Sequence, residues 1–239
     1  MALILNIETS TQVCSVNLAK DGIKIIGKET DEANAHSKVL TVFIEEILHT
    51  SGIVLNEIDA VSVSKGPGSY TGLRIGISVA KGIAYAAGKR LLSVSTLQNM
   101  AWGAKQKLNS PDETLFAPLI DARRMEVYTQ LFDYNLNPIS SIQALIIDEN
   151  GFSDISAQKT ITIFGDGAQK CKAVLSRPNI RFLDHMNPSA DYMVPFSEDA
   201  FNKSAFEDVA YFEPFYLKDF VAVIPTKNIF GQRNNEINE

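Results

Sequence analysis

Two polar stretches of the sequence have the composition of a phosphate-binding site: "ETST" at residues 8–11 and "GPGSYTG" at residues 66–72. A glycine-rich turn that leads into a helix can bind an anion, because the first amides of the helix are unpaired. Neither common nucleotide motif is complete, since a Walker loop would need Lys and Ser or Thr where the chain has Leu73 and Arg74. The stretches therefore indicate either a generic anion site or polar turns without a ligand. The residues that would form the anion site are Glu8, Thr9, Ser10, Gly66 and Gly68.

The other residues that could do chemistry are scattered along the chain. Asp121 lies at the predicted end of a strand in "DARRMEVY", where the charges suit either a charged hairpin or an anion site at a cleft. The three histidines are isolated, without the spacing that holds a metal, and no serine lies in a G-x-S-x-G elbow. The two cysteines, Cys14 and Cys171, are far apart, which suits a reducing cytoplasm rather than a disulfide framework. We therefore expect no catalytic residue, no metal and no cofactor in this chain.

The helix predicted after the second polar stretch carries only small residues along one ridge. Gly72, Gly76, Ala80, Ala84 and Gly88 follow one another at a spacing of four residues. Each interior glycine makes a helix less stable by roughly 1 kcal/mol relative to alanine, so the ridge needs a structural reason. The simplest reason is the close approach of another backbone. That neighbour is either the protein's own sheet or a helix of another subunit, and the residues leave both alternatives open.

The preceding helix, predicted for residues 35–52, has a wide apolar surface. Its apolar residues repeat with the 3.6-residue period of an amphipathic helix, and two valines widen the stripe beyond what one core contact requires. These residues are Val39, Leu40, Val42, Phe43, Ile44, Ile47 and Leu48. The surface is either entirely core or partly an interface with a partner. An exposed Phe43 or Val39 would favour the interface.

The order of the predicted elements indicates an α/β protein made of two similar subdomains. In the first hundred residues, three strands precede alternating helices and strands, and "DG" at residues 21–22 predicts a tight hairpin. The second half repeats this order loosely, with helices near 167–176 and 189–204. We therefore expect mixed sheets flanked by helices in two tandem subdomains, 1–108 and 109–239, with a cleft between them and a disordered tail from about residue 228.

The composition argues against two classes of binding. The net charge of −6 and the lack of a basic cluster disfavour a protein that binds nucleic acid alone. No apolar run approaches the roughly 18 residues of a membrane helix. We therefore expect a cytoplasmic protein without membrane contact.

Several motifs together resemble the TsaB (YeaZ-type) family. They are "ILNIETST", "AHSKVL", "SKGPGSYTGLRIGISVAKGIAYA", "DARRMEVY" and "EPFYLK". The resemblance implies an actin/hsp70-like (ASKHA, RNase H-like) fold and a dimerisation subunit of the tRNA N6-adenosine threonylcarbamoyltransferase complex. It also implies binding to the catalytic subunit TsaD, cooperation with the ATPase TsaE and contact with tRNA only through the complex. A homodimer is the other assembly that it allows for the isolated chain.

The resemblance also assigns roles to the residues described above. It implies an interface with the partner at Val39, Leu40, Phe43, Ile44, Ile47, Gly72, Gly76, Ala80 and Ala84. It also implies a vestigial nucleotide or anion site, formed by Glu8, Thr9, Ser10, Gly66, Gly68 and Asp121.

The catalytic relatives of the family suggest why this chain would not be an enzyme. At the matching positions of their acidic first turn the chain has Gln12 and Val13, and "VSTLQNMAWGA" lacks the histidine pair that binds metal in those relatives. The resemblance therefore implies a non-catalytic subunit. One alternative is an autonomous ASKHA-type kinase or ATPase that uses Glu8 and Asp121. Another is a metalloprotease, which the missing histidines disfavour.

Overall fold

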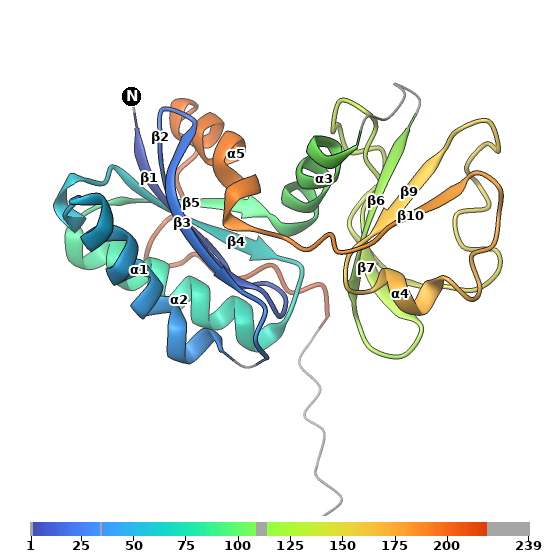
Figure 1. Cartoon of the computed structure of the whole chain (residues 1–239), viewed down its shortest axis with the longest axis horizontal. Helices are drawn as coiled ribbons and strands as arrows, with labels where there is room; N and C mark the ends of the chain where they lie inside the picture. The colour runs from blue at the N-terminus through green and yellow to red at the C-terminus, as the bar shows by residue number, and fades with distance from the viewer. Residues whose placement is uncertain (1, 34, 109–113, 219–239) are drawn as a thin grey trace, which may run out of the picture.

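Two five-stranded sheets, one in each half of the chain, form the framework of the protein (Figure 1). The computed structural model describes residues 2–33, 35–108 and 114–218. The first sheet has the order β3-β2-β1-β4-β5, with β1 (Leu3–Glu8), β2 (Cys14–Lys20), β3 (Ile23–Thr30), β4 (Ala60–Gly66) and β5 (Arg90–Ser95). The second has the order β10-β9-β6-β7-β8, with β6 (Leu115–Asp121), β7 (Glu126–Thr129), β8 (Gln143–Ile146), β9 (Ile161–Phe164) and β10 (Ile180–Leu183).

The two sheets have the same topology. In each, the first strand is central and pairs antiparallel with the second, which pairs antiparallel with the third. On its other side the first strand pairs in parallel with the fourth, and the fourth with the fifth. The prediction of two similar α/β subdomains with mixed sheets is therefore confirmed in its topology.

The hairpin between β2 and β3 forms where the sequence places it. Asp21 and Gly22 have φ angles of 51° and 75°. Two successive left-handed residues are typical of the type I′ turn, whose twist matches that of the flanking strands. The Asp-Gly pair therefore fixes the register of the outer strand β3.

Helices α1 (His36–Ser51) and α2 (Tyr70–Ala87) cover one face of the first sheet, and the 3₁₀ turn η1 (Leu55–Glu57) follows α1. Both helices end at a glycine in the left-handed conformation, Gly52 and Gly88. Their buried sides join strand residues such as Leu5, Ile7 and Val63 in one apolar cluster. This cluster is the larger core of the first half.

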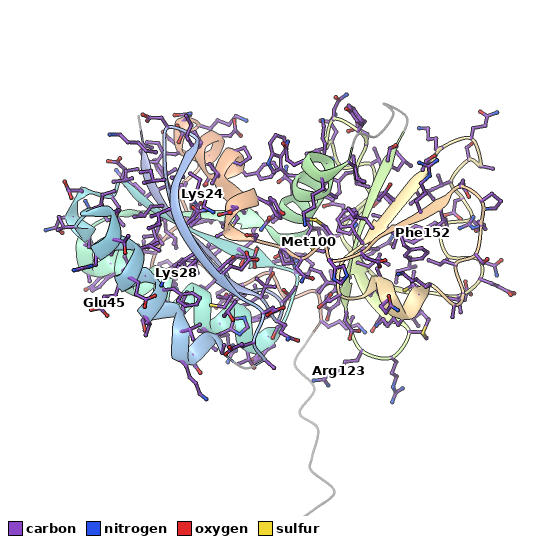
Figure 2. All side chains as sticks on the ribbon, viewed as in Figure 1. Lys24, Lys28, Glu45, Met100, Arg123 and Phe152 are labelled. Atoms are coloured by element: carbon purple, nitrogen blue, oxygen red, sulfur yellow. The ribbon has the colours of Figure 1, made fainter. Side chains whose placement is uncertain are left out.

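The two remaining long helices cross between the halves. Helix α3 (Thr96–Lys107) follows the first sheet in sequence but packs on the second, where Met100 contacts Phe116 and Phe164 in one cluster. Figure 2 labels Met100 at the junction of the halves. Helix α5 (Ala190–Asn202) follows the second sheet but covers the free face of the first.

Buried polar groups position α5 on the first sheet. The hydroxyl of Ser197 donates to the side-chain oxygen of Asn6 at 2.6 Å, and the amide of Ala190 donates to the hydroxyl of Ser15 at 2.7 Å. Because an unpaired buried polar group is unfavourable, these hydrogen bonds fix the position of α5 on the sheet. All strands of the first sheet lie within residues 1–108, and all strands of the second lie within 109–239. Helices α3 and α5 pack across that division.

The second half has shorter helices than the sequence suggested. The helix expected near 167–176 is the four-residue α4 (Ala168–Cys171), followed by turns. Strand β10 was not expected, and the helix expected near 189–204 is α5. The predicted disordered tail lies outside the described residues. No helix in the described ranges is long and apolar enough to span a membrane.

Candidate functional site

The two polar stretches that could bind an anion meet at one edge of the first sheet. Strands β1 and β4 are parallel neighbours, with Ile4 opposite Ala60 and Ile7 opposite Val63. The turn after β1 and the loop between β4 and α2 therefore leave the sheet side by side. In α/β proteins, ligands bind at the carboxyl ends of such strands. The position would thus suit a nucleotide.

In this chain the loop is closed against the turn. The amide of Ser69 donates a hydrogen bond to the carbonyl oxygen of Ser10 at 2.6 Å, and the hydroxyl of Thr9 donates to the carbonyl oxygen of Gly72 at 2.9 Å. A β-carbon at Gly68 would lie 2.2 Å from the Ser10 carbonyl oxygen. These direct contacts close the space between Thr9, Ser10 and the loop, so a phosphate does not fit there. Farther along the turn, Thr11 and Gln12 line a separate hollow of about 380 Å³ with Ser69, Thr71 and Gly72.

The small ridge of α2 faces the same turn. A β-carbon at Gly72 would lie 2.1 Å from the carbonyl oxygen of Thr9, and one at Gly76 would lie 2.1 Å from its hydroxyl oxygen. Ala80 and Ala84 are buried in the core beneath the helix. The ridge therefore permits the close approach of the protein's own first strand.

The interface predicted on this ridge is accordingly corrected. The four small residues of the ridge are buried against their own chain: Gly72, Gly76, Ala80 and Ala84. On α1, Leu40, Ile44 and Ile47 are likewise buried in the first core, because they point to the sheet. Of the predicted interface residues, Val39 and Phe43 keep part of their surface exposed.

Glu8, at the end of β1, is completely buried. Its carboxylate accepts hydrogen bonds from the amide of Ser10 at 2.8 Å and from the side-chain amide of Asn99 at 2.7 Å. Burial raises the pKa of Glu8 above the ordinary glutamate value, and hydrogen bonds from Ser10, Ser64 and Asn99 oppose that shift. Glu8 therefore links β1 to α3, and an ionised Glu8 would repel a phosphate.

Asp121 belongs to a different environment, at the end of β6 in the second half. Its carboxylate forms an ion pair with Lys170, and its backbone amide donates to the carboxylate of Asp166 at 2.9 Å. Its side chain lines a cleft of about 440 Å³ between the halves, together with residues 67–71 and 215–218.

The structure thus separates the predicted anion-site residues. Gly68 lines the same cleft as Asp121, whereas Glu8, Thr9, Ser10 and Gly66 do not. Glu8, Thr9 and Ser10 are completely buried. The Glu8 carboxylate, the Thr9 hydroxyl and the Ser10 backbone form hydrogen bonds within the first half or with α3, whereas the Ser10 hydroxyl has no partner in the described part of the chain. In the part of the chain that the structure describes, no group of three or more His, Cys, Asp or Glu residues could hold a metal ion.

Comparison with known proteins now identifies the family. The family model described as "TsaD: tRNA N6-adenosine threonylcarbamoyltransferase" matches residues 30–139. The tRNA threonylcarbamoyladenosine biosynthesis protein TsaB of Escherichia coli is 33% identical over 228 residues, which cover 92% of this chain and 96% of that protein. The chain belongs to the TsaB family.

Two further similarities extend this assignment. The solved structure described as YeaZ from Pseudomonas aeruginosa superposes with a TM-score of 0.79 and 26% identity, over 91% of this chain and 100% of that one. It confirms the predicted fold class of two α/β subdomains with mixed sheets flanked by helices. The tRNA N6-adenosine threonylcarbamoyltransferase of Staphylococcus haemolyticus is 35% identical over 134 residues, 49% of this chain and 38% of that protein.

In this TsaB chain, the surface of α1 and α2 also contains residues that the predicted interface did not include. Val42 is 45% exposed on α1, and Ser78, Gly82 and Tyr85 are exposed on α2. No atom lies within 4 Å of a β-carbon placed at Gly82. The sequence contains a signal for this exposed side. Ser78 and Gly82 lie two positions before and after Ala80, which places them on the opposite side of a helix with 3.6 residues per turn.

Proposed function

We propose that this chain is a non-catalytic subunit of the tRNA N6-adenosine threonylcarbamoyltransferase complex and binds the catalytic subunit TsaD. The observation that carries the proposal is the closure of the β4–α2 loop by the turn after β1. The Thr9 hydroxyl, the Ser10 carbonyl and the Ser69 amide form hydrogen bonds inside the chain. This supports a protein that acts by binding rather than by turnover, and the family name supports the pathway.

The proposed contact surface is the outer helix face, which we define as Val39, Val42, Phe43, Ser78 and Gly82. It joins partly exposed apolar side chains of α1 to small residues of α2, so a partner helix could approach closely. The match to the TsaD family model spans both helices. A TsaD subunit with equivalent helices could therefore pair with this face about an approximate two-fold axis.

The remaining parts of the proposal follow from the family. The chain would work with the ATPase TsaE in the cytoplasm and would meet tRNA only within the complex. In the absence of TsaD, a second copy could use the same outer helix face to form a homodimer.

The first experiment measures TsaD binding by a variant of the outer helix face. Val42→Glu should weaken binding at least tenfold, because the interface would bury an unpaired charge. Val54→Glu is the matched control, since Val54 is 60% exposed and lies outside this face. Circular dichroism melting of both isolated variants checks folding. Wild-type affinity of a folded Val42→Glu variant would place the interface elsewhere.

The second experiment separates a binding subunit from the alternative of an autonomous kinase or ATPase. Transfer of the threonylcarbamoyl group to tRNA is measured with TsaD, TsaE, ATP and the threonylcarbamoyl-adenylate donor, with and without this chain. We expect activity only when the chain is present and no turnover by the chain alone. Equal activity without it would overturn the proposal, and micromolar Mg-ATP binding by the isolated chain in calorimetry would favour the alternative.

A further inference from the structure

After α5, the chain returns across the first half and ends its described part in the cleft between the halves. The amide of Glu207 donates to the carbonyl oxygen of Leu91 at 2.9 Å, beside the edge strand β5. Farther along, the amide of Phe215 donates to the carbonyl oxygen of Lys65 at 2.8 Å. Figure 1 shows the red end of this segment reaching the space between the two halves.

A glycine makes the last approach of the segment to the first half possible. Gly66 has a φ angle of +110°, and a β-carbon there would lie 2.8 Å from the carbonyl oxygen of Phe215. Any other residue would be strained at that angle and would push the segment away. The end of β4 is therefore shaped to receive residues 213–218.

Tyr216 ties the segment to the first turn of α2. Its hydroxyl accepts a hydrogen bond from the guanidinium of Arg74 at 2.9 Å, and its ring lies 4.9 Å from the ring of Tyr70, measured between centroids. The guanidinium of Arg74 also lies 4.2 Å from the centroid of the Tyr70 ring. The three side chains form one stacked group on the first-half wall of the cleft.

Two residues farther on, the segment reaches the opposite wall. Lys218 forms an ion pair with Glu126 on β7, whose side chain is only 19% exposed. Residues 215–218 also line the cleft itself, with residues 67–71 on one side and Asp121, Arg123 and Tyr128 on the other. A segment of four residues thus contacts both halves.

We propose that residues 213–218 are an intramolecular latch that holds the cleft closed, in the place where a bound ligand would otherwise join the halves. The latch contacts are an aromatic stack, a side-chain hydrogen bond and a partly exposed ion pair, each of a weak class. They can therefore break while both cores stay folded. The halves then stay joined through α3 and α5 and can open about these helices as a hinge.

The latch is tested in the isolated chain, so its outcome does not depend on TsaD binding. Spin labels are attached to cysteines introduced at Lys20 on β2, outside the outer helix face, and at Gln143 on β8, which are exposed in different halves. The natural cysteines, Cys14 and Cys171, are buried. Pulsed electron resonance then measures the distribution of distances between the labels.

The double variant Tyr216→Ala/Lys218→Ala should broaden this distribution and shift it to longer distances. Tyr211→Ala is the matched control, because Tyr211 lies on the same segment but is 83% exposed. Lys218→Glu should also open the cleft, and adding Glu126→Lys should close it again. If Tyr216→Ala/Lys218→Ala unfolds, Tyr216→Phe/Lys218→Met replaces it, with a smaller shift expected. An unchanged distribution in the folded variants, or failure of the charge reversal to restore the distance, would overturn the latch.

Discussion

The two halves of the molecule share one strand order but connect the strands differently. In the first half, α1 and α2, of 16 and 18 residues, join the third strand to the fourth and the fourth to the fifth. In the second half, residues 147–160 contain no helix, and α4 has only 4 residues. The comparison teaches that the hydrogen-bonded ladder defines each half, whereas the crossover helices are free to vary. Only the first half uses them to build a broad helical surface.

The ends of the fourth strands show a second difference. Gly66, the last residue of β4, and Gly165, directly after β9, have similar φ angles, +110° and +106°. A β-carbon at Gly165 would lie 2.3 Å from the carbonyl oxygen of Leu119 on the central strand β6. In the first half such close contact continues into α2 through Gly72 and Gly76. In the second half it relaxes at Gly167, where the nearest atoms lie 3.0 Å away.

The largest loss of stability should come from a large side chain in the close contact between α2 and Thr9 in the first half. Gly76→Leu should lower the free energy of unfolding by about 3 kcal/mol or more, since its side chain must displace Thr9. Gly167→Leu, in the looser contact of the second half, should lower it by about 1–2 kcal/mol. Urea unfolding measures both values. The reverse order would break the comparison between the halves.

Gly82→Leu tests the other side of α2. A β-carbon at Gly82 meets nothing within 4 Å, so the isolated chain should gain up to about 1 kcal/mol from better helix propensity. The same side chain should hold a partner helix away and weaken TsaD binding at least tenfold. Ile146→Ala, at a 71% exposed position of the second half, should leave binding unchanged. Normal binding by Gly82→Leu would contradict close helix packing at this face.

Glu8→Gln tests how the charge of the buried Glu8 affects the stability of the first half. Because its folded pKa is raised, the stability that Glu8 contributes is present below the ordinary glutamate value of about 4.3 and is lost as the pH rises through the folded pKa. The variant should therefore gain stability over the wild type as the pH rises from 5 to 8. Asn99 can turn its unpaired buried oxygen toward the new amide.

Urea unfolding at several pH values follows this difference, and Glu45→Gln on the exposed side of α1 is the control. A pH-independent difference between Glu8→Gln and the wild type would show that Glu8 does not change its charge in this range.

The smallest effect should come from the acid of the second half. Asp121→Asn removes the ion pair with Lys170, but the Asp121 side chain is 49% exposed. Exposed ion pairs contribute about 0–1 kcal/mol, so we expect a change of less than about 1 kcal/mol in the free energy of unfolding. Urea unfolding measures this change beside that of Glu8→Gln. A larger loss of unfolding free energy in Asp121→Asn would mean that Asp121 and Glu8 contribute similarly to stability.

Local patterns in the sequence were sufficient for most elements of the first half. The period of the apolar residues located α1 and α2, and Asp21-Gly22 located the hairpin. These signals depend on neighbours within about four residues, which the sequence displays directly. In the second half, four of the five strands and helix α4 have only four residues each, so their signals are weaker, and β10 was missed.

The candidate site could be predicted only in part, because its geometry depends on distant contacts. The small ridge of α2 correctly indicated a close backbone, but only the fold shows that the neighbour is Thr9. Burial of Glu8 depends on Asn99, which is far away in sequence. The position of Asp121 on the opposite wall of the cleft likewise requires the arrangement of both sheets.

The crossing of α3 and α5 has a consequence for synthesis on the ribosome. All five strands of the first sheet have been synthesised once the chain reaches Ser95. The helix that covers the second face of this sheet, α5, is complete only at Asn202. At about 5–20 residues per second, the nascent chain waits roughly 5–20 s with that face uncovered. A message truncated between the halves should therefore yield insoluble protein, and translation speed through residues 109–202 should affect the yield of folded chain.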